Sequence, residues 1–515
     1  MRIAMFLFIW LRRLPALFIG YFALFMLICL FVMGLFLQVE DVTRITRLLL
    51  GLLQIPEVVL QLQIIALASN GVVMVLLLGV ATLISYNLSV FLYRKSRGRP
   101  KVTVSEPLTP APGKGTKLDR FKKIGIILAG GGAKGAYQAG AMKAIHEFLE
   151  ENNALDKVKM IAGTSIGSWN SMFWLADLVK ARDGQPSVHE QWWRSISIKR
   201  LVEFDYYFPL YKNSFLLPTP WKEGFEQIFV EDGKVHKHLS RLFNAAKQES
   251  ARPIHFYFTR SNVELGRVEF STNRSDLDSL YRPAFGRSGK AQQKLVVEPD
   301  RYELIGGADT ESAIRKMCRG VFASMDLPPL FPYITVKVDR TEWFEDGGVV
   351  DNLPVWFGTQ LEECDLLFIL PLNASFAEPV NHTSITKRLF RVMDVRQGAL
   401  ERNSLKLTYL YNELAAAKRS MSKPAPGSDI QSATAERVLE RVHTPVSVFA
   451  ICPDQPLTIG TAELWKNREA GDAFELMYAE TKYELKEKFE ELTQTDWIRL
   501  VLVRPQGERV YVDNF

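Results

Sequence analysis

Cysteine is scarce in this sequence, and it forms no pattern that would bind a metal or build a disulfide framework. The 515 residues contain four widely spaced cysteines and no C-x-x-C pair. Small secreted domains need dense cysteine frameworks, and zinc sites need clustered cysteine and histidine ligands. We therefore expect reduced thiols in a reducing compartment and no metal site.

A strong charge of one sign is also missing. The sequence has 63 lysine and arginine residues against 57 aspartate and glutamate residues, a formal net charge of +6. Proteins that bind nucleic acid usually gather basic residues in a patch or carry a recognisable motif such as a zinc finger. No such motif is visible and the net charge is mild, so we expect no nucleic-acid partner.

Long hydrophobic runs, in contrast, are present near the start of the sequence. Residues 14–37 (LPALFIGYFALFMLICLFVMGLFL) and 71–93 (GVVMVLLLGVATLISYNLSVFLY) contain no charged side chain. Each exceeds the roughly 20 residues that span a bilayer, and neither has the polar face of a surface helix. We predict a membrane anchor over residues 1–93 with two transmembrane helices. A cleaved signal peptide fits the first run poorly, because the run is too long and no small-residue cleavage site follows it.

Basic residues flank the outer ends of both runs and predict the orientation. Three arginines precede the first run, and five basic residues follow the second within residues 94–101. The positive-inside rule then places the rest of the chain in the cytoplasm, at the inner membrane if the protein is bacterial. Residues 48–67 are apolar but interrupted by polar side chains, which favours an interfacial helix; a third span there would reverse the orientation.

The basic residues belong to a proline- and glycine-rich segment, residues 94–116, that we interpret as a flexible linker. Their positive charge would suit anionic lipid headgroups, although a stop-transfer flank has the same composition.

The remaining sequence predicts an α/β domain. An isoleucine-rich run at 123–129 is typical of a buried parallel strand and is followed by glycines and by helical spacing over 136–150. A second strand at 158–162 leads into a helix that starts at residue 166. Alternating strands and helices indicate a parallel sheet with right-handed crossovers. Further strands are predicted at 254–259, 268–271, 366–370 and 446–452.

Two regions extend this pattern. Residues 183–253 form an aromatic-rich insertion, which suits either a lid or acyl-chain pocket wall or an ordinary satellite core. Residues 376–515 are expected to form a C-terminal α/β extension packed on a catalytic domain at 117–375. Within the extension, residues 473–492 predict an amphipathic helix that packs on the sheet.

The strongest motif is Gly163-Thr164-Ser165-Ile166-Gly167. It has the G-x-S-x-G pattern, in which a serine sits on a tight turn between a strand and a helix with its hydroxyl exposed. The predicted strand before it and helix after it provide that setting. Gly163 and Gly167 relieve the crowding of the turn, and Ser165 is therefore a candidate nucleophile.

A glycine run precedes this motif and comprises Gly130, Gly131, Gly132, Lys134 and Gly135 around Ala133. It fits the dinucleotide pattern G-x-G-x-x-G, but the next strand ends in the serine turn rather than in an acidic residue suited to a ribose. A P-loop is excluded because Gly135, and not serine or threonine, follows Lys134. The remaining interpretation is an oxyanion hole, with the N–H groups of Gly131 and Gly132 as donors.

The third motif is Asp346-Gly347-Gly348, a carboxylate on a glycine turn. Such a sequence is also an ordinary turn, so it is not diagnostic alone. Together, the three motifs supply a nucleophile, a base and an anion cradle, which are the parts of an acyl-transfer enzyme.

In this order and spacing, the three motifs resemble the patatin-like phospholipases. Asn352 and Pro354 after the aspartate, and Ala323-Ser324 before it, fit the same resemblance. It covers roughly residues 118–372 and implies a three-layer α/β/α domain, here preceded by the two transmembrane helices. It also implies a Ser165–Asp346 dyad, in which Asp346 is the base, with residues 130–135 as oxyanion hole. The implied substrate is a membrane phospholipid or related ester, cleaved without metal or cofactor.

Two other functions remain open from the sequence. A Ser–His–Asp esterase would use His382 or His443, the two of the seven histidines that follow Asp346. A non-catalytic membrane scaffold would keep the fold but would be expected to lose one of the motif residues, and all are intact. The leading prediction is a membrane-anchored serine acylhydrolase of the phospholipase A or lysophospholipase type.

Overall fold

A computed structural model describes the chain from residue 117 onward, with gaps. The chain separates into two units, Met1–Pro100 and Lys101–Phe515, and all described residues belong to the second. The residues outside the description are 1–116, 182–184, 205–213, 215, 244–253, 278–300, 307–308, 329, 335–341, 374–384, 422–444, 454–458, 462, 465, 490–497, 504–508 and 513–515.

A ten-stranded mixed sheet forms the centre of the second unit, in the order β12-β11-β10-β9-β1-β2-β5-β6-β7, with β8 paired to β5. The strands from β11 to β5 are mutually parallel, and every residue of β1 and β9 is buried, as expected for strands covered on both faces. The strands of this sheet are β1 (Ile124–Leu128), β2 (Val158–Thr164), β5 (His255–Asn262), β6 (Arg267–Thr272), β7 (Tyr302–Leu304), β8 (Phe344–Asp346), β9 (Leu366–Leu370), β10 (Ser447–Pro453), β11 (Ile498–Val503) and β12 (Arg509–Val512).

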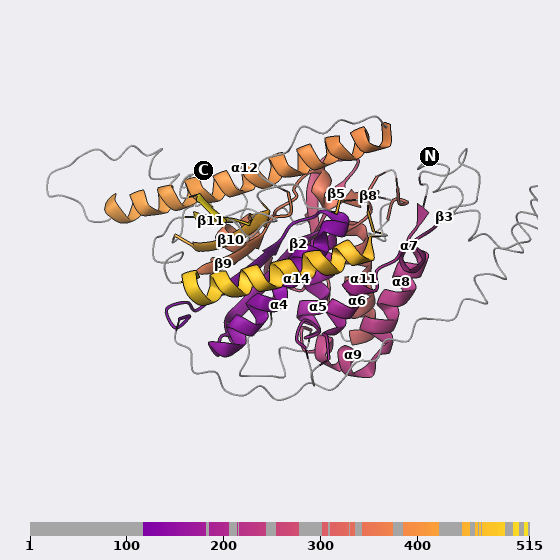
Figure 1. Cartoon of the computed structure of the whole chain (residues 1–515), viewed down its shortest axis with the longest axis horizontal. Helices are drawn as coiled ribbons and strands as arrows, with labels where there is room; N and C mark the ends of the chain where they lie inside the picture. The colour runs from indigo at the N-terminus through magenta and orange to yellow at the C-terminus, as the bar shows by residue number, and fades with distance from the viewer. Residues whose placement is uncertain are drawn as a thin grey trace, which may run out of the picture. The chain divides into compact units, whose positions relative to one another are not determined.

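Helices cover both faces of the sheet. In Figure 1, α12 lies along one side, at the top of the view, whereas α4, α14 and α5 lie on the other. The described helices are α4 (Gly135–Glu151), α5 (Ile166–Leu175), α6 (Val188–Arg194), α7 (Ile198–Leu201), α8 (Thr219–Glu226), α9 (Gly233–Ser240), α11 (Thr310–Ser324), α12 (Ile385–Met421) and α14 (Asn467–Tyr483). Short 3-10 or π turns are η1 (Gly132–Lys134), η2 (Leu155–Lys157), η4 (Gln227–Glu231), η7 (Gly347–Val349), η8 (Phe357–Leu361) and η9 (Glu484–Lys488), and a small hairpin pairs β3 (Glu203–Phe204) with β4 (Leu216–Leu217).

The strand register brings the three motifs to one edge of the sheet. Leu128, the last residue of β1, pairs with Gly163 of β2 and with Leu370 of β9. The glycine loop after β1 and the serine turn after β2 therefore leave the sheet side by side. Antiparallel pairing of Arg260 in β5 with Asp346 in β8 adds the aspartate turn to the same region.

The predicted α/β architecture is confirmed. The helix predicted at 473–492 is α14 with η9, and it packs on the sheet as predicted, since the Phe489 ring contacts Phe368 of β9 and Phe449 of β10. It also packs closely on α4, because Gly140 of α4 allows close approach of the Phe474 carbonyl. The sequence left the aromatic insertion open between a lid or pocket wall and a satellite core; in the structure, Trp193 and Trp221 belong to the main hydrophobic core.

The predicted membrane anchor and linker lie outside the described residues, so both stay predictions. Within the described part of the chain, no helix combines the length and the apolar character needed to cross a bilayer.

Candidate active site

Ser165 sits on a strained turn between β2 and α5. Its backbone angles, φ 53° and ψ −124°, are unusual for a residue with a side chain and cost about 1–3 kcal/mol. The flanking glycines make the turn possible. A Cβ on Gly163 would lie 2.5 Å from the carbonyl carbon of Gly167, and a Cβ on Gly167 would lie 2.4 Å from the carbonyl oxygen of Leu128. Such a turn holds the serine hydroxyl away from the backbone, as a nucleophile requires.

The Asp346 carboxylate accepts a hydrogen bond from the Ser165 hydroxyl, from Oγ to Oδ2. Its other oxygen accepts the N–H of Gly348 at 2.8 Å, which fixes the carboxylate on its own turn. Asp346 is 1% exposed, and Ser165 is buried as well. Nucleophile and carboxylate therefore meet although 181 residues separate them in the sequence.

Burial makes the Asp346 carboxylate more basic than an ordinary one. It raises the pKa of Asp346 to about 7, with a smaller contribution from the charge of Glu345. The hydrogen bonds from Ser165 and Gly348 act in the opposite direction, because they stabilise the charged form. A general base works best when its pKa lies near the working pH, and Asp346 meets that condition.

The glycine loop offers two N–H groups that are not used within the described structure. The N–H of Gly130 donates to the Asn352 carbonyl at 3.3 Å, and that of Lys134 donates to the Gly131 carbonyl at 3.1 Å. The N–H of Gly135 also bonds within the loop. Among the described hydrogen bonds, none involves the N–H groups of Gly131 and Gly132, the two donors proposed from the sequence.

The Lys134 side chain points away from the reacting groups. Its ammonium donates to Asn373 Oδ1 and to Asp394 Oδ1, both at 2.9 Å. Lys134 was grouped with the oxyanion hole from its sequence position, but these contacts give its charge a different partner.

Ser324 is a site residue to which the motifs assign no role. Its hydroxyl accepts the backbone N–H of Ser165 at 2.8 Å and lies 2.9 Å from the hydroxyl of Ser168, which in turn donates to the Gly163 carbonyl. The Ala323-Ser324 pair was noticed as part of the family resemblance, and that was the available signal. Ser324 ties the end of α11 to the serine turn.

Asp326 is a second residue that the sequence did not single out. Its carbonyl accepts the N–H of Asp346 at 2.9 Å, and its carboxyl group is buried. Burial raises the pKa of Asp326 to about 8; the charge of Lys222 opposes this shift.

No described histidine hydrogen-bonds Ser165 or Asp346. His189 is buried, lies 2.9 Å from Asn170 Oδ1, and has its pKa lowered to about 3 by burial, so it is neutral. His382 and His443, the residues of the triad alternative, lie outside the described residues. Across the described part of the chain, no group of histidine, cysteine and acidic side chains is arranged to hold a metal ion.

The aromatic side chains of the insertion surround Trp169, one helical turn after Ser165. Trp192, Trp221 and Phe225 have ring centroids within 4.4–5.1 Å of the Trp169 ring. These contacts make the insertion a continuation of the core beneath the serine turn.

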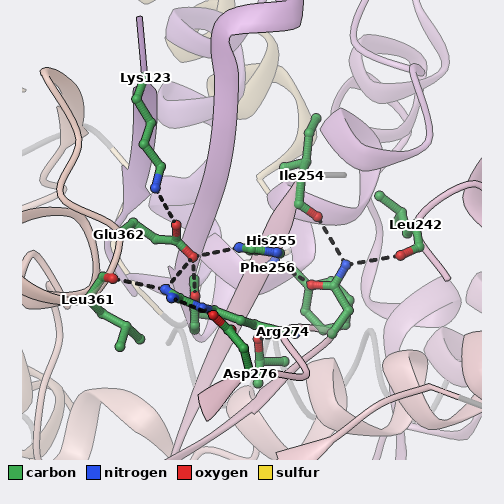
Figure 2. A network of polar contacts seen from close by, with 12 residues as sticks. Lys123, Leu242, Ile254, His255, Phe256, Arg274, Asp276, Leu361 and Glu362 are labelled. Carbon is green, nitrogen blue, oxygen red and sulfur yellow. Dashed lines mark hydrogen bonds and ion pairs between the residues drawn. The ribbon is translucent and has the colours of Figure 1, made fainter. Parts of the chain in front are cut away.

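A separate polar cluster lies at the end of β1 opposite the glycine loop (Figure 2). Its centre is Glu362, which pairs with Lys123, His255 and Arg274 and accepts the Tyr257 hydroxyl. Burial alone would raise the pKa of Glu362, but the hydrogen bond from His255 and the nearby positive charges lower it to about 2. This cluster ties the start of β1 to the start of β5.

Comparison with known proteins gives an independent assignment. Residues 126–357 match the model of the family described as patatin-like phospholipase, and the match includes the glycine loop, Ser165 and Asp346. No curated protein sequence matches the chain. Among solved structures, VipD from Legionella pneumophila is 13% identical, covers 71% of this chain and 67% of its own, and has a TM-score of 0.32, which is too low to establish a shared fold. Residues 126–357 therefore carry a patatin-like phospholipase domain, and the chain is a lipid acyl hydrolase.

Proposed function

We propose that the chain is a membrane-anchored serine acylhydrolase of the phospholipase A or lysophospholipase type, which uses Ser165 as nucleophile and Asp346 as base. The observation that carries the proposal is the hydrogen bond from the Ser165 hydroxyl to a buried carboxylate with a pKa of about 7. A serine hydroxyl is a weak nucleophile until an adjacent base removes its proton.

In the first half of the reaction, Ser165 Oγ attacks the ester carbonyl carbon while its proton passes to Asp346. The tetrahedral intermediate carries a negative oxygen, which the N–H groups of Gly131 and Gly132 would bind. When the intermediate collapses, the C–O bond to the lysolipid or glycerol portion breaks. Asp346 returns the proton to that leaving oxygen, and the acyl group stays on Ser165.

In the second half, a water molecule gives a proton to Asp346 and attacks the acyl-serine carbonyl. Collapse of the second intermediate releases the fatty acid, and Asp346 returns the proton to Ser165 Oγ. The same carboxylate thus serves twice as base and twice as acid, for which a pKa near neutrality is suited.

The substrate class and location follow from the sequence and the family match together. We propose a membrane phospholipid or lysophospholipid as substrate. We also propose that residues 1–93 anchor the enzyme with its catalytic domain in the cytoplasm, where the basic residues at 94–101 lie near anionic headgroups. Tethering would give a lipid substrate a high effective concentration at the site.

The test is fatty-acid release from mixed phospholipid vesicles by the full chain, with a chelator present. We expect activity in the wild type and its loss in Ser165→Ala and in Asp346→Asn. A fluorophosphonate probe should label the wild type, and it should fail to label only a protein in which Ser165 is replaced or inactive. Replacement of His382 or His443 by glutamine should leave turnover unchanged. Loss of activity in a folded histidine variant would favour the triad esterase, and a wild type with neither turnover nor labelling would favour the scaffold.

A further inference from the structure

The glycine loop that would bind the oxyanion has few side chains of its own, and its position is set by contacts from elsewhere. Gly132 has φ +56°, and a Cβ there would lie 2.1 Å from the Thr461 carbonyl oxygen. That carbonyl accepts the N–H of Ala133 at 2.9 Å. The backbone at Thr461, far downstream in the sequence, therefore lies in direct contact with the loop.

The first end of the loop is held by Asn352. The Asn352 carbonyl accepts the N–H of Gly130, and its side-chain amide donates to the Gly130 carbonyl at 3.1 Å. The Asn352 Oδ1 atom is wedged between two glycine turns, because a Cβ on either Gly130 or Gly348 would lie 2.5 Å from it. Asn352 thus connects the glycine loop with the aspartate turn.

Glu401 on α12 fixes the orientation of Asn352. Its Oε1 accepts the side-chain amides of Asn352 at 2.6 Å and of Asn373 at 2.7 Å, and its Oε2 accepts the N–H of Asn373 at 3.0 Å. Glu401 is 2% exposed, so water does not compete for these bonds. If the Asn352 amide were flipped, its oxygen would face two acceptors, the Glu401 carboxylate and the Gly130 carbonyl. These two groups therefore fix the orientation of the amide.

The second end of the loop is held through Lys134 by Asp394, also on α12. Asp394 Oδ1 accepts both the Lys134 ammonium at 2.9 Å and the Thr461 hydroxyl at 2.6 Å. Asn373 Oδ1 also accepts from Lys134. Asp394 therefore joins the two residues, Lys134 and Thr461, that restrain the loop at this end.

We propose that Glu401 and Asp394 are positioning residues that hold the glycine loop so that the N–H groups of Gly131 and Gly132 stay directed at the oxyanion. The inference rests on the proposed function, and it makes α12 part of the catalytic apparatus. Asn373, Asp394, Glu401 and Thr461 all follow the family-matched residues 126–357, and the last three lie in the C-terminal extension.

The expected effect is on turnover rather than on substrate binding. Loss of one oxyanion donor typically lowers kcat by about 100- to 1000-fold, and a small displacement of a reacting group costs up to about 100-fold. We expect Glu401→Ala to lower kcat by about 10- to 100-fold with KM changed less than about threefold. Asp394→Ala should act similarly, whereas Asp394→Asn keeps an oxygen acceptor and should remain within about threefold of the wild type.

The experiment uses the full chain, a soluble short-chain ester and hydrogen exchange of residues 130–134. Glu362→Gln is the matched control, because Glu362 is equally buried and multiply bonded but lies at the other end of β1. It should lower the unfolding temperature yet leave kcat and exchange of the loop unchanged. A cycle of Asn352→Ala, Glu401→Ala and the double variant should show non-additive losses, since both act through one chain of bonds.

The outcomes separate the inference from the proposed function. Faster exchange of residues 130–134 together with lower kcat in Glu401→Ala supports positioning. Wild-type kcat and exchange in folded Glu401→Ala and Asp394→Ala would overturn it, and so would an equal kcat loss in Glu362→Gln. If Glu401→Ala does not fold, the Asp394→Ala and Asp394→Asn pair decides by itself. A wild type without Ser165-dependent turnover would instead refute the proposed function, while exchange of the loop still reports on the restraint.

Discussion

The pH dependence of turnover should report the Asp346 carboxylate. Only the ionised form can accept the Ser165 proton, and the pKa of Asp346 is about 7. About one tenth of the carboxylate is then ionised at pH 6 and about nine tenths at pH 8. We expect kcat/KM to rise about tenfold between these values and to level off above pH 8.

Removing a neighbouring negative charge should shift the pH at which kcat/KM rises. Glu345 precedes Asp346, is partly buried, and its charge raises the pKa of Asp346. In Glu345→Gln the midpoint of the rise in kcat/KM should therefore move to lower pH. A partly screened charge changes a pKa by about half a unit, so kcat/KM at pH 6 should rise about two- to threefold while the plateau is retained.

The assay is kcat/KM for a soluble ester from pH 5 to 9 with the full chain in detergent, so that interfacial binding does not contribute. Glu311→Gln is the control, because Glu311 is an exposed carboxylate at the start of α11 and its loss changes the net charge equally. A wild-type midpoint near 4, or the same midpoint in Glu345→Gln and the wild type, would refute the assignment of Asp346 as a buried base.

Three further predictions follow from the same geometry. Asp346→Asn should raise the unfolding temperature at pH 8 but not at pH 4. Burial raises the pKa of Asp346 in the folded state above its unfolded value, so the charged carboxylate destabilises the fold increasingly as pH rises from about 4 to 7. Equal unfolding temperatures of the variant and the wild type at pH 8 would contradict this. Gly167→Ala should lose at least about 100-fold in turnover, because the new Cβ meets the Leu128 carbonyl, while Gly233→Ala, which meets nothing within 4 Å, should retain activity in the same assay. Trp169→Ala should lower the free energy of unfolding by about 3–5 kcal/mol in a denaturant titration, and a loss below about 1 kcal/mol would show that the aromatic cluster is not a packed core.

Much of the fold could be predicted because the signals were local. The strand predicted at 366–370 is β9, with the same bounds, and the helix predicted at 136–150 is α4 to within one residue at each end. Both stand in apolar runs or helical spacing that a short window reveals. The serine turn was predictable for the same reason, since strand, glycine-flanked serine and helix are contiguous.

The packing of the insertion could not be predicted from composition. Aromatic side chains are buried by a lid, by a pocket wall and by a core alike, so their abundance does not distinguish these structures. The structure shows that Trp193 and Trp221 continue the main core. The packing of α14 on α4 depended on close backbone approach at Gly140, for which a helix pattern gives no signal.

The contacts of α12 with the site were equally invisible in the sequence. Glu401 lies in the charged stretch LERNSLK, which by its local pattern is an ordinary solvent-facing helix segment. Its burial depends on Asn352 and Asn373, 49 and 28 residues away. A charged residue in a helix becomes a candidate only when the fold shows that its carboxylate is buried and bonded.

A loop made mainly of glycine poses a physical problem for catalysis, and α12 addresses it. Glycine lets the backbone approach an oxyanion closely, but it also has the greatest conformational freedom of any residue. Oxyanion donors stabilise a transition state only when they are already in place, because reorganising them would consume the energy they supply. The loop cannot provide that rigidity with its own side chains. In this chain the restraint comes from Asn352 and Lys134, whose partners, the buried Glu401 and the half-buried Asp394, lie on one 37-residue helix. A rigid helix across one face of the sheet thus sets the position of a loop that is flexible by composition.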